Sequence, residues 1–217
     1  MTTTCCCQLT PGGQRGQRMH HRQGGISLVV CLVMLLATLL LGVSAAQIAL
    51  QGEKAARGDR DYQIALQAAE AGLMDAELDI ENSPDPSISR SALFAGGGAE
   101  GFIAGCGAGL ANPHLGLCSQ PAEGMPPAWT SIDFLDESAN ARSVPYGRFT
   151  GQSFQAGQGP LPAKVPRYVI ELMPYNRAGE DATKGGRTYL YRITSMGFGM
   201  RDTTQVVLQT VYRKEDR

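Results

Sequence analysis

The sequence contains few of the residues on which metal sites and hydrolytic active sites depend. It has three histidines in 217 residues, and His114 alone lies outside the first 25 positions. No pair of histidines or cysteines has the spacing of a catalytic zinc site, and Gly151-Gln152-Ser153-Phe154-Gln155 lacks the final glycine of a nucleophile elbow. The glycines of 96–101 lack the preceding strand and following helix of a nucleotide-binding loop. We therefore expect no enzymatic activity, no metal and no cofactor.

Charged residues are also sparse, at 18% of the chain, with a formal net charge of −1. The first 25 residues contain Arg15, Arg18 and Arg22 and no acid, so the chain after them has a larger excess of negative charge. Binding to nucleic acid through bulk positive charge requires the opposite balance. We expect no nucleic-acid partner.

One long uncharged segment dominates the N-terminal part. Ile26 to Gly52 contains no charged residue, and its centre, Leu28 to Leu41, is almost entirely apolar. It exceeds the roughly 20 residues that a helix needs to cross a bilayer, and the apolar core of a secretory signal is shorter, at about 7 to 15 residues. We expect a transmembrane helix over 26–52. The arginines of the 1–25 leader favour a cytoplasmic N-terminus.

A helical pattern continues beyond this segment, over 53–82. Apolar or small side chains recur at alternating steps of four and three: Tyr62, Leu66, Ala69, Leu73, Ala76 and Ile80. This stripe predicts an amphipathic helix, which Pro84 and Pro86 end. Acidic residues such as Asp75 and Asp79 surround the stripe, and those near its C-terminal end oppose the helix dipole.

The remaining residues divide into a loop-rich region and a strand region. Residues 83–165 are rich in glycine, proline and serine and show no sustained periodicity. From Arg167 onward, alternating side chains predict a half-buried strand ended by Pro174, then strands around 189–193 and 206–212. We expect 166–217 to form an antiparallel sheet covered by the helical stripe, an α+β arrangement.

Two of the six cysteines are candidates for a disulfide. Cys5-Cys6-Cys7 belongs to the leader, and Cys31 lies in the membrane segment, where a small apolar role is the default. Cys106 and Cys118 remain in the part expected to be exported, where a disulfide is the simplest arrangement and two free thiols are the alternative. The bond would contribute roughly 3 kcal/mol in the chain-entropy model.

The N-terminal part resembles a type IV prepilin, because a basic leader ending in glycine precedes an apolar helix with an amphipathic continuation. The resemblance implies that prepilin peptidase cleaves between Gly25 and Ile26 and that Ile26 is N-methylated. Prepilin leaders are commonly short, and a true start at Met19 would give such a leader. The alternative is an unusually long leader from Met1.

Longer runs are similar to the PilX family of type IV pilus minor pilins. They are 38–45 and 57–73 at one end and 191–199 and 205–213 at the other. The resemblance implies a pilin-like α+β fold. In that fold a long N-terminal helix spans the membrane with its first half and packs its second half on a small antiparallel sheet of three or more strands.

Val30 departs from the common pilin pattern. It is the fifth residue counted from Ile26, where most pilins carry a glutamate thought to balance the amino terminus of a neighbouring subunit. Most pilins also begin with phenylalanine instead of isoleucine. An uncompensated charge in lipid costs several kcal/mol. The missing acid therefore favours an initiating or tip position over the repetitive shaft.

The resemblance implies a minor pilin that primes assembly of a type IV pilus, sits at its tip, and serves twitching motility and adhesion. The implied partners are the other minor pilins, the major pilin, prepilin peptidase, the assembly platform and a tip adhesin. The chain would lie in the inner membrane before assembly and at the pilus tip or cell surface afterwards. Two alternatives remain: a K-type minor pseudopilin of a type II secretion system, which also lacks the glutamate, and a single-pass membrane-anchored binding module.

Overall fold

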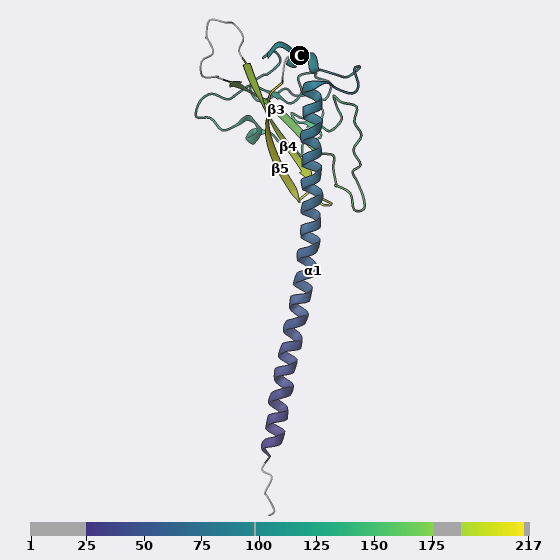
Figure 1. Cartoon of the computed structure of the whole chain (residues 1–217), viewed down its shortest axis with the longest axis vertical. Coiled ribbons are helices and arrows are strands. Elements are labelled where there is room, and N and C mark those ends of the chain that lie inside the picture. The colour runs from purple at the N-terminus through teal and green to yellow at the C-terminus, as the bar shows by residue number, and fades with distance from the viewer. Residues whose placement is uncertain (1–24, 98, 176–187, 215–217) are drawn as a thin grey trace, which may run out of the picture. The chain divides into compact units, whose positions relative to one another are not determined.

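The computed structural model describes residues 25–97, 99–175 and 188–214 (Figure 1). In chain order the elements are α1 (Ile26–Glu81), η1 (Ser91–Gly97), β1 (Leu117–Cys118), η2 (Ala128–Ser131), β2 (Val144–Pro145), β3 (Arg167–Tyr175), β4 (Thr188–Phe198) and β5 (Gln205–Tyr212). The chain divides into two compact units, Met1–Gly52 and Glu53–Arg217. The proposed start at Met19 and the cysteines Cys5 to Cys7 lie outside the described residues.

The first unit contains the first half of α1. An 18-residue window there has a mean hydropathy of 2.9, and none of it is buried, so by length and composition the helix can cross a membrane. Two of its hydroxyl groups bond within the helix, because Thr38 donates to the carbonyl of Leu35 at 3.0 Å and Ser44 donates to that of Leu40 at 2.9 Å. Internal hydrogen bonds of this kind are what a lipid environment requires.

The second unit is built on a five-stranded mixed sheet with the order β1-β3-β4-β5. The three long strands form the predicted antiparallel meander, in which Ile193 of β4 lies opposite both Ile170 and Thr210. Two short strands from the loop-rich region extend the sheet beyond β3. β2 pairs with β3 antiparallel, whereas β1 pairs with β3 in parallel. The sheet is therefore mixed, whereas the sequence predicted a purely antiparallel one.

The second half of α1 lies along one face of this sheet (Figure 1). The main core joins the helix and sheet through buried side chains, among them Ala76, Ile80, Phe94, Tyr168, Ile170, Tyr191 and Ile193. A second cluster, around Cys106, Cys118, Ala128, Ile132 and Phe134, includes Val169. β3 is therefore buried on both faces from Arg167 to Leu172, and the prediction of a half-buried strand is wrong. Pro174 does not end β3, because it still pairs with Tyr189.

The buried face of α1 also differs from the predicted stripe. Ala69, Ala76 and Ile80 are buried, but Tyr62 is 50% exposed. The buried set includes the positions one residue earlier than the stripe: Asp61, Ala65, Ala68, Gly72, Asp75 and Asp79. Small side chains are required on this face because the sheet lies close to the helix. A Cβ on Gly72 would lie 2.2 Å from Ser195 Oγ, and a Cβ on Gly197 would lie 2.2 Å from the Ala65 carbonyl oxygen.

Candidate functional site

The predicted cleavage bond lies at the start of α1. Gly25 directly precedes the first helical residue, Ile26, and both residues are exposed. No described atom lies within 4 Å of a Cβ placed on Gly25. A peptidase would therefore meet no obstruction from the described residues at this bond. Cleavage after Gly25 and methylation of Ile26 remain predictions.

The membrane segment offers apolar surface and no acid. Val30 lies just over one turn after Ile26 and is half exposed, and Cys31 is a free, exposed thiol. Without a hydrophobic driving force between helices in lipid, such a segment associates through van der Waals packing. Val30 can contribute to this packing, but it cannot neutralise a neighbouring amino terminus.

Three aspartates on the buried face of α1 tie the helix to three different loops. The first, Asp61, holds the turn between β4 and β5. Its Oδ1 accepts the N–H of Met200 at 2.5 Å, and its Oδ2 accepts Thr204 Oγ1 at 2.6 Å and Arg201 Nε at 3.1 Å. Burial alone would raise the pKa of Asp61, but these hydrogen bonds outweigh burial and lower the pKa below its usual 3.8.

The second aspartate, Asp75, holds a loop before β3. Its Oδ2 accepts the N–H of Gly147 at 2.8 Å, and its Oδ1 accepts the hydroxyl of Thr150. Burial raises the pKa of Asp75, the two hydrogen bonds oppose that rise, and the nearby charge of Asp79 adds to it. The carboxylate therefore fixes the loop, although its burial disfavours the charged form.

The third aspartate, Asp79, is the centre of a buried polar network. Both of its oxygens accept from Arg90, and Oδ2 also accepts the hydroxyl of Tyr168 at 2.8 Å. Burial, followed by the charge of Asp79, raises the pKa of Tyr168 well above its usual range, so the phenol stays a donor. This network joins the last turns of α1 to β3 and to the segment before η1.

The C-terminal end of α1 is capped by the end of the chain. Lys214 Nζ donates to the carbonyl of Ile80 at 2.7 Å and to that of Ser91 at 3.1 Å, and the Tyr212 hydroxyl donates to Glu81 Oε1 at 2.7 Å. The lysine supplies the positive charge that favours a helix C-terminus.

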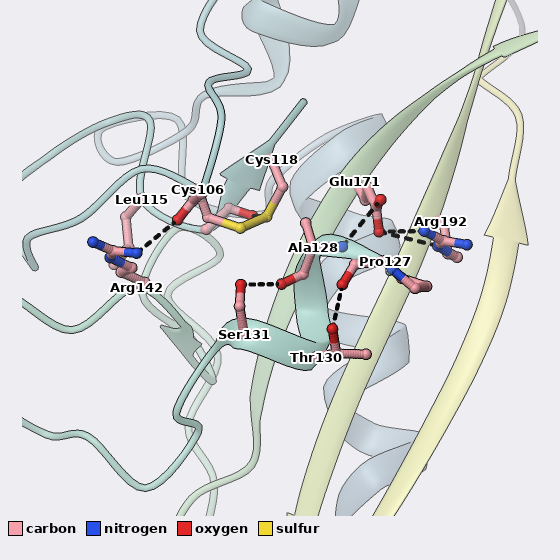
Figure 2. Close-up of a disulfide and its surroundings, with 12 residues drawn as sticks. Cys106, Leu115, Cys118, Pro127, Ala128, Thr130, Ser131, Arg142, Glu171 and Arg192 are labelled. Carbon is pink, nitrogen blue, oxygen red and sulfur yellow. Dashed lines mark hydrogen bonds and ion pairs between the residues drawn. A yellow bond between two sulfur atoms is a disulfide. The ribbon is translucent and has the colours of Figure 1, made fainter. Parts of the chain in front are cut away.

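The predicted disulfide is present in the second unit, where Cys106 is bonded to Cys118 (Figure 2). Cys118 belongs to β1, and Cys106 has a φ of 69°, a conformation that residues other than glycine rarely adopt. Together with Ala128 and Ile132, the pair packs on Val169. The bond therefore fastens the loop-rich region to the face of β3 opposite to α1.

A partly buried ion pair lies beside the disulfide. Figure 2 shows Glu171 of β3 facing Arg192 of β4, with Oε2 2.5 Å from Nη2, while Oε1 accepts the N–H of Ala128 at 3.4 Å. The two residues are cross-strand partners. Because Glu171 is buried, this pair fixes η2 over the sheet, and the sequence pattern gave no sign of it.

The residues that the structure describes give no indication of catalysis. None of them form a group of three or more His, Cys, Asp or Glu side chains that could hold a metal. His114 is half-buried, and its Nδ1 has no hydrogen-bond partner. The acids discussed above serve internal contacts.

Comparison with known families gave two matches, one at each end of the chain. Residues 23–73 match the model described as PilX N-terminal, and residues 114–214 match the model described as Type IV pilus assembly protein PilX C-term. The first match contains the predicted cleavage junction, Gly25 and Ile26, and both matches include residues of the contact between α1 and the sheet. No curated protein and no solved structure matches the chain.

Proposed function

Because this chain belongs to the PilX family of type IV pilus assembly proteins, we propose that it primes assembly of a type IV pilus and stays at the pilus tip. Membership makes it a minor pilin, a structural component that associates with other pilus components and with the membrane. The proposal also includes cleavage after Gly25, a cytoplasmic N-terminus before assembly, and a function in twitching motility and adhesion.

The observation that carries the tip position is the absence of an acid in the anchor. Every residue from Ile26 to Gly52 is uncharged, and Val30 occupies the position of the common pilin glutamate. A subunit at the start of a filament has no preceding neighbour whose amino terminus needs a counter-charge. An acid there would be an unpaired group among apolar helices, at a cost of about 3 kcal/mol on insertion scales.

The proposed partners follow from this position. Prepilin peptidase would remove the leader, and the assembly platform would receive the mature anchor. Exchange of lipid contacts for equivalent packing would then join the anchor to other minor pilins and the major pilin. An adhesin is the expected partner at the exposed end of the tip.

The test compares Val30→Glu with Val30→Leu in a strain that lacks this gene. The proposal predicts that Val30→Leu restores surface pili, whereas Val30→Glu restores clearly fewer. Equal pilus numbers for the two variants would show that the missing acid does not determine the subunit's position.

The role in a pilus is tested separately from the role in a secretion machine. Deletion of the gene should abolish twitching and surface pili and leave protein secretion intact. Loss of secretion with normal pili would assign the chain to a pseudopilus instead.

A further inference from the structure

The last strand of the sheet has one edge that no described residue pairs with. β5 ends the strand order, and its one strand partner is β4. At the turn of this hairpin the N–H of Gly199 donates to the carbonyl of Thr204 at 2.8 Å, so these two residues form a hydrogen-bonded pair. Every second residue of β5 from Thr204 onward, at 206, 208, 210 and 212, therefore bonds to β4. The N–H and C=O groups of Val207, Gln209 and Val211 therefore point away from β4.

β5 lacks the features that protect exposed edges. Its sequence, Gln-Val-Val-Leu-Gln-Thr-Val-Tyr, contains no charge, proline or glycine. Val207 is 37% exposed and Val211 is 55% exposed, on the sheet face opposite to α1. Gln209 lies between them, and its amide donates to Thr194 Oγ1 at 2.9 Å. A long, uncharged, β-branched edge of this kind is a template for another strand.

We propose that this edge is the docking site for an extended, uncharged segment of another pilus subunit, which adds to the sheet beside β5. Main-chain hydrogen bonds at 207, 209 and 211 hold the segment, and apolar side chains beside Val207 and Val211 set its register. The identity of the partner rests on the proposed function.

The direction of β5 argues against a second copy of this chain as the partner. β5 runs in the same direction as the buried part of α1, because Val206 packs with Ala65 and Ala69 while Tyr212 reaches Glu81. Antiparallel pairing of two β5 strands would point residues 61–81 of the two copies in opposite directions. Subunits of one filament share a direction, so this pairing is not available within it.

Parallel pairing of two copies meets a second obstacle. A two-fold axis along the strands turns one sheet over, which would place the two α1 helices on opposite faces of the joint sheet. The outer residues Val207 and Val211 of one copy would then lie beside the helix-facing side of the other. An extended segment of a different subunit meets neither obstacle.

The test places a photo-crosslinking benzophenone residue at Val211 of the full chain, in cells that assemble pili. The matched control places it at Met125, which is 65% exposed in a loop outside the sheet. The proposal predicts an adduct at Val211 whose mass spectrum identifies a segment of another pilus subunit, and no such adduct at Met125.

Two further variants separate main-chain pairing from simple proximity. Gln209→Pro removes an N–H that points to the free edge and leaves the main-chain bonds to β4 intact, so the strand should persist. Gln209→Ala removes the side-chain bond to Thr194 and keeps that N–H. Adduct yield at Val211 should fall about tenfold or more in Gln209→Pro, the effect of losing one or two hydrogen bonds, and persist in Gln209→Ala.

Several outcomes would overturn the docking site. They are no adduct at Val211, equal adducts at Met125, equal yields in the two Gln209 variants, or adducts confined to a second copy or to this chain itself. If the chain is still cleaved and required for pili when no adduct forms, the docking site is wrong and the proposed function stands.

Discussion

Asp79 and Arg90 form an ion pair that is closed to solvent, with Oδ2 2.6 Å from Nη2 and the two side chains 0% and 3% exposed. The guanidinium also donates to the carbonyls of Pro113 and Leu115, and it lies 3.8 Å from the centre of the Phe149 ring. Every nitrogen of Arg90 therefore has an acceptor. One arginine joins the end of α1 to two parts of the loop-rich region.

Removing one member of this pair should be strongly destabilising. Asp79→Ala leaves a buried guanidinium without its counter-charge, and we expect a loss of about 3 to 5 kcal/mol in the free energy of unfolding. Glu70→Ala, at an exposed acid of the same helix, should change it by no more than about 0.5 kcal/mol. Urea unfolding of the purified protein in detergent measures both, and equal losses would contradict the network.

The contact between α1 and β4 should tolerate no added methyl group. A Cβ on Gly197 would lie 2.2 Å from both the carbonyl oxygen of Ala65 and the nitrogen of Ala69, so Gly197→Ala should cost about 1 to 3 kcal/mol or more. Gly58→Ala, with open space around it, should stabilise the helix by about 1 kcal/mol. The same unfolding experiment tests the pair, and a neutral Gly197→Ala would show that the elements lie further apart.

The disulfide should contribute more to the stability of the folded protein than the membrane cysteine Cys31 does. Cys106→Ser opens a loop with a sequence separation of 12, and we expect a loss of roughly 3 kcal/mol in the chain-entropy model. Cys31→Ser removes a free thiol and should leave stability unchanged. Alkylation of natively purified protein with and without reductant checks the bond itself. Labelling of Cys106 and Cys118 without reductant would refute it.

Acid should release the turn that Asp61 holds. Because the pKa of Asp61 is lowered in the folded state, its stabilising contribution is present above 3.8 and is lost as pH falls through the lower folded value. The stability difference between the wild type and Asp61→Asn should therefore be constant near neutral pH and shrink below about pH 4. A difference that grows on acidification would contradict the lowered pKa.

The sequence predicts the architecture of this chain because its long elements are strongly periodic. The helix and the three main strands follow from their apolar spacing, and Cys106 and Cys118 follow from elimination among six cysteines. The short strands β1 and β2 could not be predicted, because two-residue elements carry no period. They exist because β3 offers them an edge.

The buried aspartates show where apolar patterning fails. Asp61, Asp75 and Asp79 repeat the spacing of the predicted stripe one residue earlier, so they share a face with Ala65, Ala68 and Gly72. The sequence does contain one signal for their burial: these acids recur at helical spacing within a stripe of small residues. Their partners, such as Met200, Gly147 and Arg90, are brought there by tertiary structure and leave no mark in local sequence.

The most direct test of the central claim is mass spectrometry of the N-terminus of the protein taken from cells with active prepilin peptidase. A pilin that enters a filament must lose its leader, so we expect a chain that begins at a methylated Ile26. The same protein from a strain without the peptidase should retain the leader up to and including Gly25. A chain that keeps its leader in the presence of the active enzyme would contradict the assignment to a type IV pilus.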